Sequence, residues 1–97
     1  MRRARRILHR KRFYDDGTIS ELTLWLVPDP VRGSEHPFKY SLFYGSPGRR
    51  LVGYDNEPGK GDHRHYEDAE EPYRFTTSEQ LVRDFLVDVR RIRRQQG

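Results

Sequence analysis

Two histidines separated by one residue, His63 and His65, stand in a segment rich in charged residues and tyrosines. If this segment is extended, side chains two positions apart point to the same side, so the two imidazoles share one face. Two imidazoles on one surface can divide the work of general base and general acid near neutral pH. They can also bind a metal ion. The spacing therefore indicates a chemical site with two alternative uses.

Polar residues near the histidine pair could complete an acid–base site that cleaves RNA. Lys60 would stabilise the charged phosphorane, and Asp55 would orient one imidazole by accepting its second N–H. Arg64 could supply a further cation if the chain folds it back toward the phosphate, and Tyr54 or Tyr66 could stack on an unpaired base. We predict that the histidine pair, Lys60 and Asp55 are catalytic and that Arg64, Tyr54 and Tyr66 contact nucleic acid.

A metal site at the histidine pair would need a third ligand, for which Asp55, Asp62 and His9 are the candidates. No complete ligand spacing is present, so we expect neither a metal nor another cofactor. A plainer alternative is a pair of exposed strand histidines without a function. His9, in a basic strand, and His36, in a proline-rich loop, are expected to play no part.

The charges are unevenly distributed along the chain. Residues 2–12 contain seven cationic side chains and no acid, whereas residues 55–71 contain seven acids against two cations. The C-terminal segment carries Arg90, Arg91, Arg93 and Arg94. Because basic segments attract phosphate backbones, we expect this tail to contact RNA.

The composition limits the class of protein. Ninety-seven residues favour a single domain, 1–97, and 33% hydrophobic against 35% charged residues implies a small core. We expect residues 1–5 and 94–97 to be frayed. The chain has no cysteine, which excludes disulfides and thiolate metal sites. Without an apolar run of about 18–20 residues, we expect no membrane contact and place the protein in the cytoplasm.

Strands are predicted where hydrophobic and polar residues alternate between turn signals. Asp16-Gly17 and Pro47-Gly48 have the composition of hairpin turns, and residues 28–37 contain too many prolines for a strand. The expected strands are residues 6–14, 18–27, 38–44, 49–55 and a shorter fifth one in the histidine segment.

A single helix is predicted near the C-terminus. Thr76 or Thr77 can cap it, with Glu79 or Gln80 three residues further on. One apolar stripe at helical spacing follows, made of Leu81, Val82, Phe85, Leu86, Val89 and Ile92. Asp84 and Asp88 are expected off this stripe. The fold class is therefore α+β: an antiparallel meander of four to five strands packed against one C-terminal helix in two layers.

Several motifs together resemble the small TumE-type toxins. They are Tyr-Asp-Asn at 54–56, the histidine segment at 60–66 and Glu-Pro-Tyr-Arg-Phe at 71–75, followed by the apolar helix. The resemblance covers roughly residues 10–92. It implies a toxin of a bacterial type II toxin–antitoxin module, with ribonuclease activity as the expected reaction, neutralised by an antitoxin with a helix-turn-helix domain.

The candidate site residues and the resemblance to the TumE-type toxins together favour a growth-inhibiting endoribonuclease that cleaves RNA without a metal. The alternative is a non-catalytic module that binds nucleic acid or another protein. Whether the chain forms a homodimer stays open.

Overall fold

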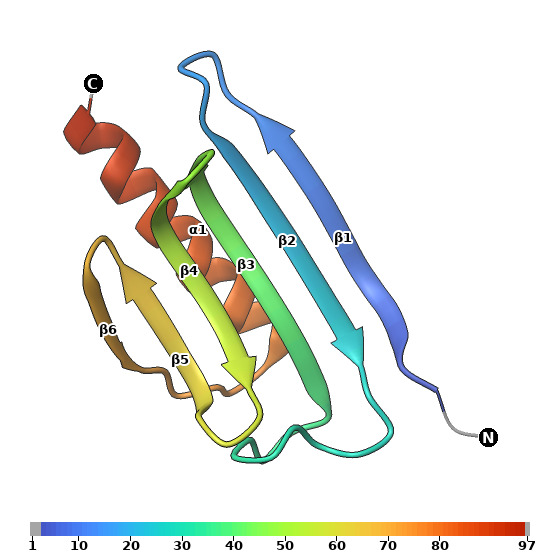
Figure 1. Cartoon of the computed structure of the whole chain (residues 1–97). Coiled ribbons are helices and arrows are strands. Elements are labelled where there is room, and N and C mark those ends of the chain that lie inside the picture. The colour runs from blue at the N-terminus through green and yellow to red at the C-terminus, as the bar shows by residue number, and fades with distance from the viewer. Residues whose placement is uncertain (1–2, 97) are drawn as a thin grey trace.

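The computed structural model describes residues 3–96 as six strands followed by one helix (Figure 1). Every strand pairs antiparallel with the next one in chain order, so the sheet is a meander. The elements are β1 (Arg5–Phe13), β2 (Ile19–Leu26), β3 (Phe38–Ser46), β4 (Arg49–Glu57), β5 (Gly61–Tyr66), β6 (Ala69–Pro72) and α1 (Ser78–Gln96). The predicted α+β class is confirmed, with one strand more than the four to five expected.

The additional strand is β6, with the sequence Ala-Glu-Glu-Pro. It has no alternation of apolar and polar residues, and all four residues are exposed, so the sequence carries no strand signal there. It forms because the chain reverses directly after β5 at Glu67, whose φ is +54°. Pairing of β6 with β5 then follows from the tight turn rather than from burial.

Turn glycines determine where the first hairpins reverse. Gly17 and Gly48 have φ values of +86° and +77°, which a residue with a Cβ adopts only at a cost. The carboxylate of Asp16 accepts hydrogen bonds from the backbone N–H and the hydroxyl of Thr18 and so closes the first turn. Both hairpins predicted from the sequence are present.

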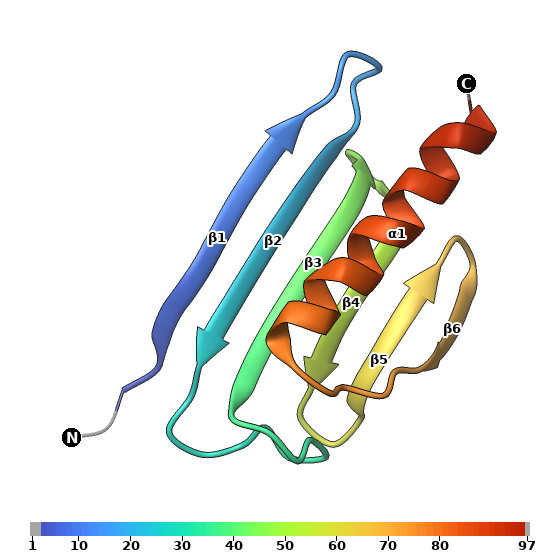
Figure 2. The same cartoon turned by 180° about the vertical axis from the view of Figure 1, so that it is seen from behind.

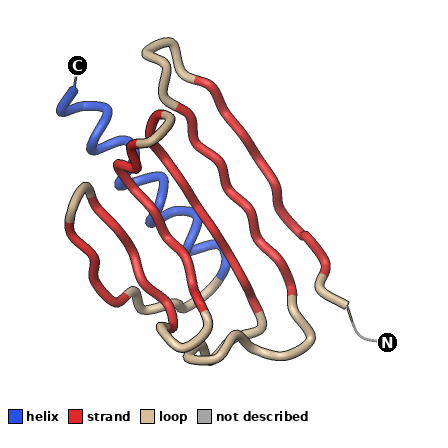
Figure 3. The backbone as a smooth tube through the Cα atoms, viewed as in Figure 1, coloured by secondary structure: helices blue, strands red, loops and turns tan. Residues whose placement is uncertain are grey.

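The helix packs on β3 and β4 and forms the second layer (Figure 2). The Phe85 ring, fully buried, meets the Tyr54 ring edge-on with centroids 5.9 Å apart. Buried side chains from both layers make up the core: Leu22, Leu24, Tyr40, Leu42, Tyr44, Leu51, Val52, Tyr54, Leu81, Phe85, Val89 and Ile92. The first two strands extend sideways beyond the helix (Figure 3).

The ends of the helix differ in part from expectation. Thr77 is the cap, since its Oγ1 accepts the Gln80 N–H at 3.0 Å. Residues 94–96, for which the sequence suggests fraying, belong to α1, which continues to Gln96. Arg93 holds this last turn by donating to the Tyr44 hydroxyl at 3.0 Å. Residues 1, 2 and 97 lie outside the described part of the chain.

Asp88 is buried, contrary to its expected place off the apolar stripe. It lies three positions after Phe85 and seven after Leu81, so helical geometry turns it toward the sheet. There it accepts a short hydrogen bond from the Tyr54 hydroxyl, and Arg91 Nη2 lies 3.3 Å from its Oδ1. These partners allow a carboxylate to be tolerated in the core.

Candidate active site

The histidines lie on the face of the sheet that α1 leaves uncovered. The antiparallel register sets Asp55 opposite His63 and Gly53 opposite His65. Their neighbours Tyr54 and Arg64, also opposite each other, face the helix. The two imidazole centroids are 5.1 Å apart. The spacing of two therefore brings His63, His65 and Asp55 together, as the sequence predicts.

His63 is buried, and both of its ring nitrogens face an oxygen atom. Nδ1 lies 3.1 Å from the backbone oxygen of Gly61, and Nε2 lies 2.5 Å from Asp55 Oδ1. The Oδ1 atom is buried without a hydrogen bond of normal geometry, so the contact with Nε2 is close but poorly aligned. Two facing lone pairs would repel at this distance, so the contact needs a proton or a cation between the two atoms. Asp55 and His63 thus form a close contact within the sheet, which is an ion pair when His63 carries a proton on both ring nitrogens.

His65 is half-buried and has a different environment. Burial lowers the pKa of His65 below its ordinary value of 6.5, and the positive charge of Arg50 lowers it further. The imidazole is therefore mainly neutral at pH 7. Its Nδ1 lies 3.7 Å from Glu70 Oε2. A neutral imidazole on an open face is suited to accept a proton.

Arg50 is a site residue that the sequence analysis missed. Its side chain crosses over Gly53, because a Cβ on Gly53 would lie 2.6 Å from Arg50 Cδ. Gly53 is the cross-strand partner of His65, so this path brings the guanidinium toward His65. A glycine inside a strand is a signal of such close approach, and it was visible in the sequence.

Glu70 is the second missed residue. Its Oε1 lies 3.9 Å from His63 Nε2, so its carboxylate borders both histidines. The residue reaches them because β6 pairs with β5, with Glu70 opposite His65. Since β6 itself was not predicted, nothing in the sequence placed Glu70 here.

Lys60 follows β4 in an exposed turn and lies at the edge of the same region. It lines a hollow of about 360 Å³ together with Asp62, His63, Glu70, Glu71 and Pro72. The ammonium can therefore approach a phosphate that lies next to His63.

Three predicted RNA contacts lie on the other face of the sheet. Tyr54 has no exposed surface, and burial followed by its bond to Asp88 raises the pKa of its hydroxyl above the ordinary value. Arg64 donates to the Tyr54 hydroxyl at 3.2 Å and pairs with Glu71, and Tyr66 lies under Arg91 at 5.8 Å. The segment is a regular strand, so it does not fold Arg64 back, and these residues join the sheet to the helix.

The arginines of the tail divide into two pairs. Arg93 donates to Thr18 and Tyr44 and stacks on the Tyr14 ring at 3.9 Å, and Arg91 pairs with Asp88. Arg90 and Arg94 are exposed, and Arg91 is exposed too although it pairs with Asp88. All four lie in the helix layer, so an RNA that contacts both Arg90 and the histidines has to pass an edge of the sheet.

A metal could be held by Asp55, His63 and His65, whose ligand atoms lie within 4.8 Å of one another. Two imidazoles and one carboxylate suit a transition metal. A backbone carbonyl at the second nitrogen, as Gly61 provides for His63, is a common orienting contact of histidine ligands. The residues present therefore fit a metal as well as a proton.

His36 makes structural contacts and lies apart from the histidine pair. Its Nε2 lies 3.0 Å from both carboxylate oxygens of Asp62, and its ring stacks on Phe75 with centroids 3.6 Å apart. Nearby, a Cβ on Gly33 would lie 2.8 Å from the Gly61 nitrogen, so the proline-rich loop approaches the start of β5 closely. The loop is thereby fixed beside the backbone that holds His63.

The profile of the family described as Toxin TumE matches residues 3–93. Comparison with curated proteins and with solved structures gives no significant match. Among the residues described, no helix is long and apolar enough to cross a membrane.

Proposed function

The chain belongs to the TumE family of toxins, and we propose that it is the toxin of a type II module and cleaves RNA without a metal. One observation carries the proposal: His65, whose pKa is lowered by burial, lies next to the close Asp55–His63 contact on the uncovered face of the sheet. The antitoxin that the family implies is proposed to carry a helix-turn-helix domain, and the reaction to take place in the cytoplasm.

The proposed reaction starts with His65 as the general base. Its neutral imidazole removes the proton of a ribose 2′-OH, and the 2′-oxygen attacks the adjacent phosphorus. Arg50 and Lys60 stabilise the negative charge that builds up on the phosphorane oxygens. Arg50 serves this purpose in place of Arg64, which is committed to the other face.

His63 completes the reaction as the general acid. Asp55 orients the His63 ring at Nε2, and a proton carried by His63 is proposed to pass to the leaving 5′-oxygen. The P–O5′ bond breaks as this proton is transferred. The products are a 2′,3′-cyclic phosphate and a 5′-hydroxyl, and the two histidines end with exchanged protonation states.

Cleavage of an end-labelled single-stranded RNA by the purified protein, with and without EDTA, tests the proposal. We expect fragments ending in a 2′,3′-cyclic phosphate in both conditions, and their loss in His65→Gln and Asp55→Asn. His9→Gln is the matched control, since His9 pairs with Glu21 at 2.9 Å on an exposed part of the sheet. Intact RNA with the wild-type protein would refute ribonuclease activity.

A second candidate is metal-assisted hydrolysis by the same residues. It is favoured by the Asp55–His63–His65 cluster, which offers a metal three ligand atoms. This reaction would use an activated water, so its products would lack the cyclic phosphate and EDTA would stop it. If RNA binding alone survives every histidine variant, the protein is a binding module instead.

A further inference from the structure

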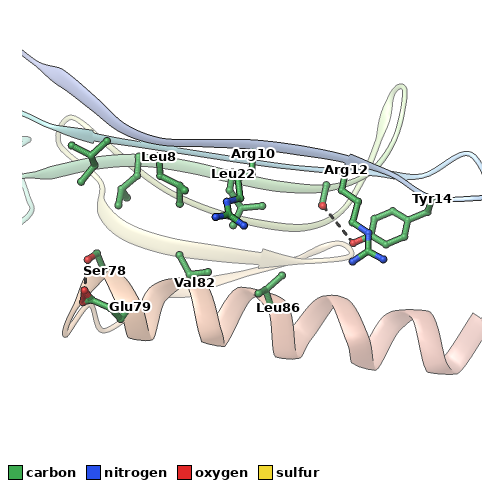
Figure 4. A pocket seen from close by; sticks show the side chains of 12 residues that line it. Leu8, Arg10, Arg12, Tyr14, Leu22, Ser78, Glu79, Val82 and Leu86 are labelled. Carbon is green, nitrogen blue, oxygen red and sulfur yellow. Dashed lines mark hydrogen bonds between the residues drawn. The ribbon is translucent and has the colours of Figure 1, made fainter.

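An apolar groove of about 630 Å³ runs between α1 and the first two strands, on the face opposite the histidines (Figure 4). Leu8 of β1 and Leu22 and Leu24 of β2 line its sheet side. Val82 and Leu86 point toward them from the helix. Within residues 3–96, α1 makes close backbone contacts with β3 and β4 but not with β1 or β2.

The groove leaves part of the helix stripe unburied. Val82 and Leu86 belong to the apolar stripe of α1, yet they are only half-buried, whereas Phe85 and Val89 are buried. Tyr14, which also lines the groove, is covered on one ring face by Arg93. Apolar side chains on both walls indicate a surface that gains stability when another apolar side chain enters.

Cations line the outer wall of the groove. Arg10 and Arg12 extend from β1 toward the helix, and both are exposed (Figure 4). Glu79 is the one acid among the described residues that line the groove, and it lies at the first turn of the helix. The floor is therefore apolar and the rim positive.

We propose that this groove binds an acidic amphipathic helix of the antitoxin. An apolar stripe on that helix would cover Val82 and Leu86, and its acidic flank would face Arg10 and Arg12. The proposal rests on the partner that the toxin family implies, and it does not depend on ribonuclease activity.

Two other occupants fit the groove less well. RNA would satisfy the arginines, but it has no apolar stripe for the leucines. A second copy of this chain would bring the basic outer surface of its own helix, with Arg83, Arg90 and Arg94, or its basic first strand. Like charges would then meet at Arg10 and Arg12, which opposes association.

The position of the groove also separates docking from chemistry. Because it lies on the helix-bearing face, a substitution there leaves the Asp55–His63 pair on the other face in place. Toxin variants that escape the antitoxin and still act on RNA are therefore expected in the groove.

Titration of the purified toxin with its cognate antitoxin tests the proposal, and a synthetic peptide provides a defined probe. The peptide is an amphipathic helix of about 18 residues, five turns, with leucines on one face and glutamates beside them. A second peptide carries lysine in place of each glutamate. We expect the wild-type toxin to bind the glutamate peptide at least about tenfold more tightly than the lysine peptide.

Charge reversal then locates the binding surface. Arg10→Glu/Arg12→Glu is expected to weaken antitoxin and glutamate-peptide binding at least about tenfold and to reverse the preference between the peptides. Lys11→Glu/Lys39→Glu is the matched control, because both lysines are exposed and alternate with the groove residues onto the opposite face. It is expected to change binding less than about threefold, and thermal unfolding checks that both variants fold.

Three results would overturn the proposal. One is equal antitoxin binding by Arg10→Glu/Arg12→Glu and the wild type. Another is loss of single-stranded RNA binding in that variant with antitoxin binding unchanged, which would assign the groove to RNA. The third is a toxin dimer in sedimentation that Val82→Glu dissociates, which would assign the groove to a second copy.

Discussion

The two histidines of the site, although separated by only one residue, have different surroundings. His63 has an oxygen at each ring nitrogen, whereas His65 is half-buried near the guanidinium of Arg50. The same residue type is thus held in two environments that suit an acid and a base. Period-two spacing predicts that they share a face, but their individual surroundings depend on Gly61, Gly53 and β6.

The activity is expected to need neutral His65, so it should fall as the pH drops and His65 is protonated. Because burial and Arg50 lower the pKa of His65, the midpoint of this acid limb should lie below 6.5. Removal of one cause in Arg50→Gln should move the midpoint to higher pH and also reduce the plateau rate. Rates of RNA cleavage across the pH range measure both effects, with Arg49→Gln at the neighbouring exposed position as the control. If the midpoint of the acid limb in Arg50→Gln equals that in the wild type, the assignment is contradicted.

The lowered pKa of His65 also has a consequence for stability. The unfolded chain binds a proton at the ordinary pKa of 6.5, whereas folded His65 binds it less tightly. The stability tied to neutral His65 is therefore present above pH 6.5 and is lost as the pH falls through the folded value. Urea unfolding at several pH values should show a smaller acid-side loss in His65→Gln than in the wild type. An identical pH dependence in the two proteins would show that His65 titrates normally.

At the scale of elements, the helix is held to the sheet mainly by its central aromatic residue. Phe85 is fully buried against Tyr54, so Phe85→Ala should lower the free energy of unfolding by roughly 3–5 kcal/mol. Val87→Ala, at a position that is 46% exposed in the same helix, should change it by about 0.5 kcal/mol or less. Urea titrations of the three proteins give the comparison, and equal losses in the two variants would contradict the packing described.

The elements could be predicted to the extent that local signals encode them. The turn glycines and the helical apolar spacing gave five strands and α1 with bounds close to those observed. The strand β6 was missed because a short, exposed, acidic segment looks like a loop until the preceding turn pairs it. Asp88 was misplaced because its residue type argues for solvent while its helical position argues for the core. Arg50 was missed because Gly53 signals a close approach without identifying the side chain that makes it, and the strand register is needed to place that side chain near His65.

At the scale of the whole molecule, the two faces of the sheet have different surroundings. One face carries the histidines, Asp55 and Arg50, and the other carries the helix and the groove beside it. Alternation along β1, β4 and β5 produces this division, since neighbouring residues point to opposite faces. Because the groove and the histidines also lie on different strands, the proposed chemistry and the proposed partner binding can be tested by separate substitutions.

Binding of RNA is expected to depend strongly on salt. Each phosphate neutralised on a single strand contributes about −0.7 to the slope of log K against log salt, so four contacts give a slope near −3. If exposed Arg90 and Arg94 both contact phosphates, Arg90→Gln/Arg94→Gln should make the slope less negative by about 1.4. Fluorescence titrations at several salt concentrations measure it, with Arg83→Gln at the other end of the helix as control. An unchanged slope would confine the RNA to the face with the histidines.

Expression of the chain alone is expected to arrest bacterial growth, and co-expression of its antitoxin to restore it, as membership of the toxin family implies. His65→Gln should abolish the arrest, because it removes the proposed base while keeping a polar side chain of similar size. His9→Gln should stay toxic, since the exposed His9–Glu21 pair lies on β1 and β2, which β3 separates from the site on β4 and β5. Growth curves after induction, with cooperative unfolding of each purified variant as the folding check, provide the measurement. Full toxicity of His65→Gln, Asp55→Asn and His63→Gln would remove these side chains from the mechanism, and the arrest would then come from binding alone.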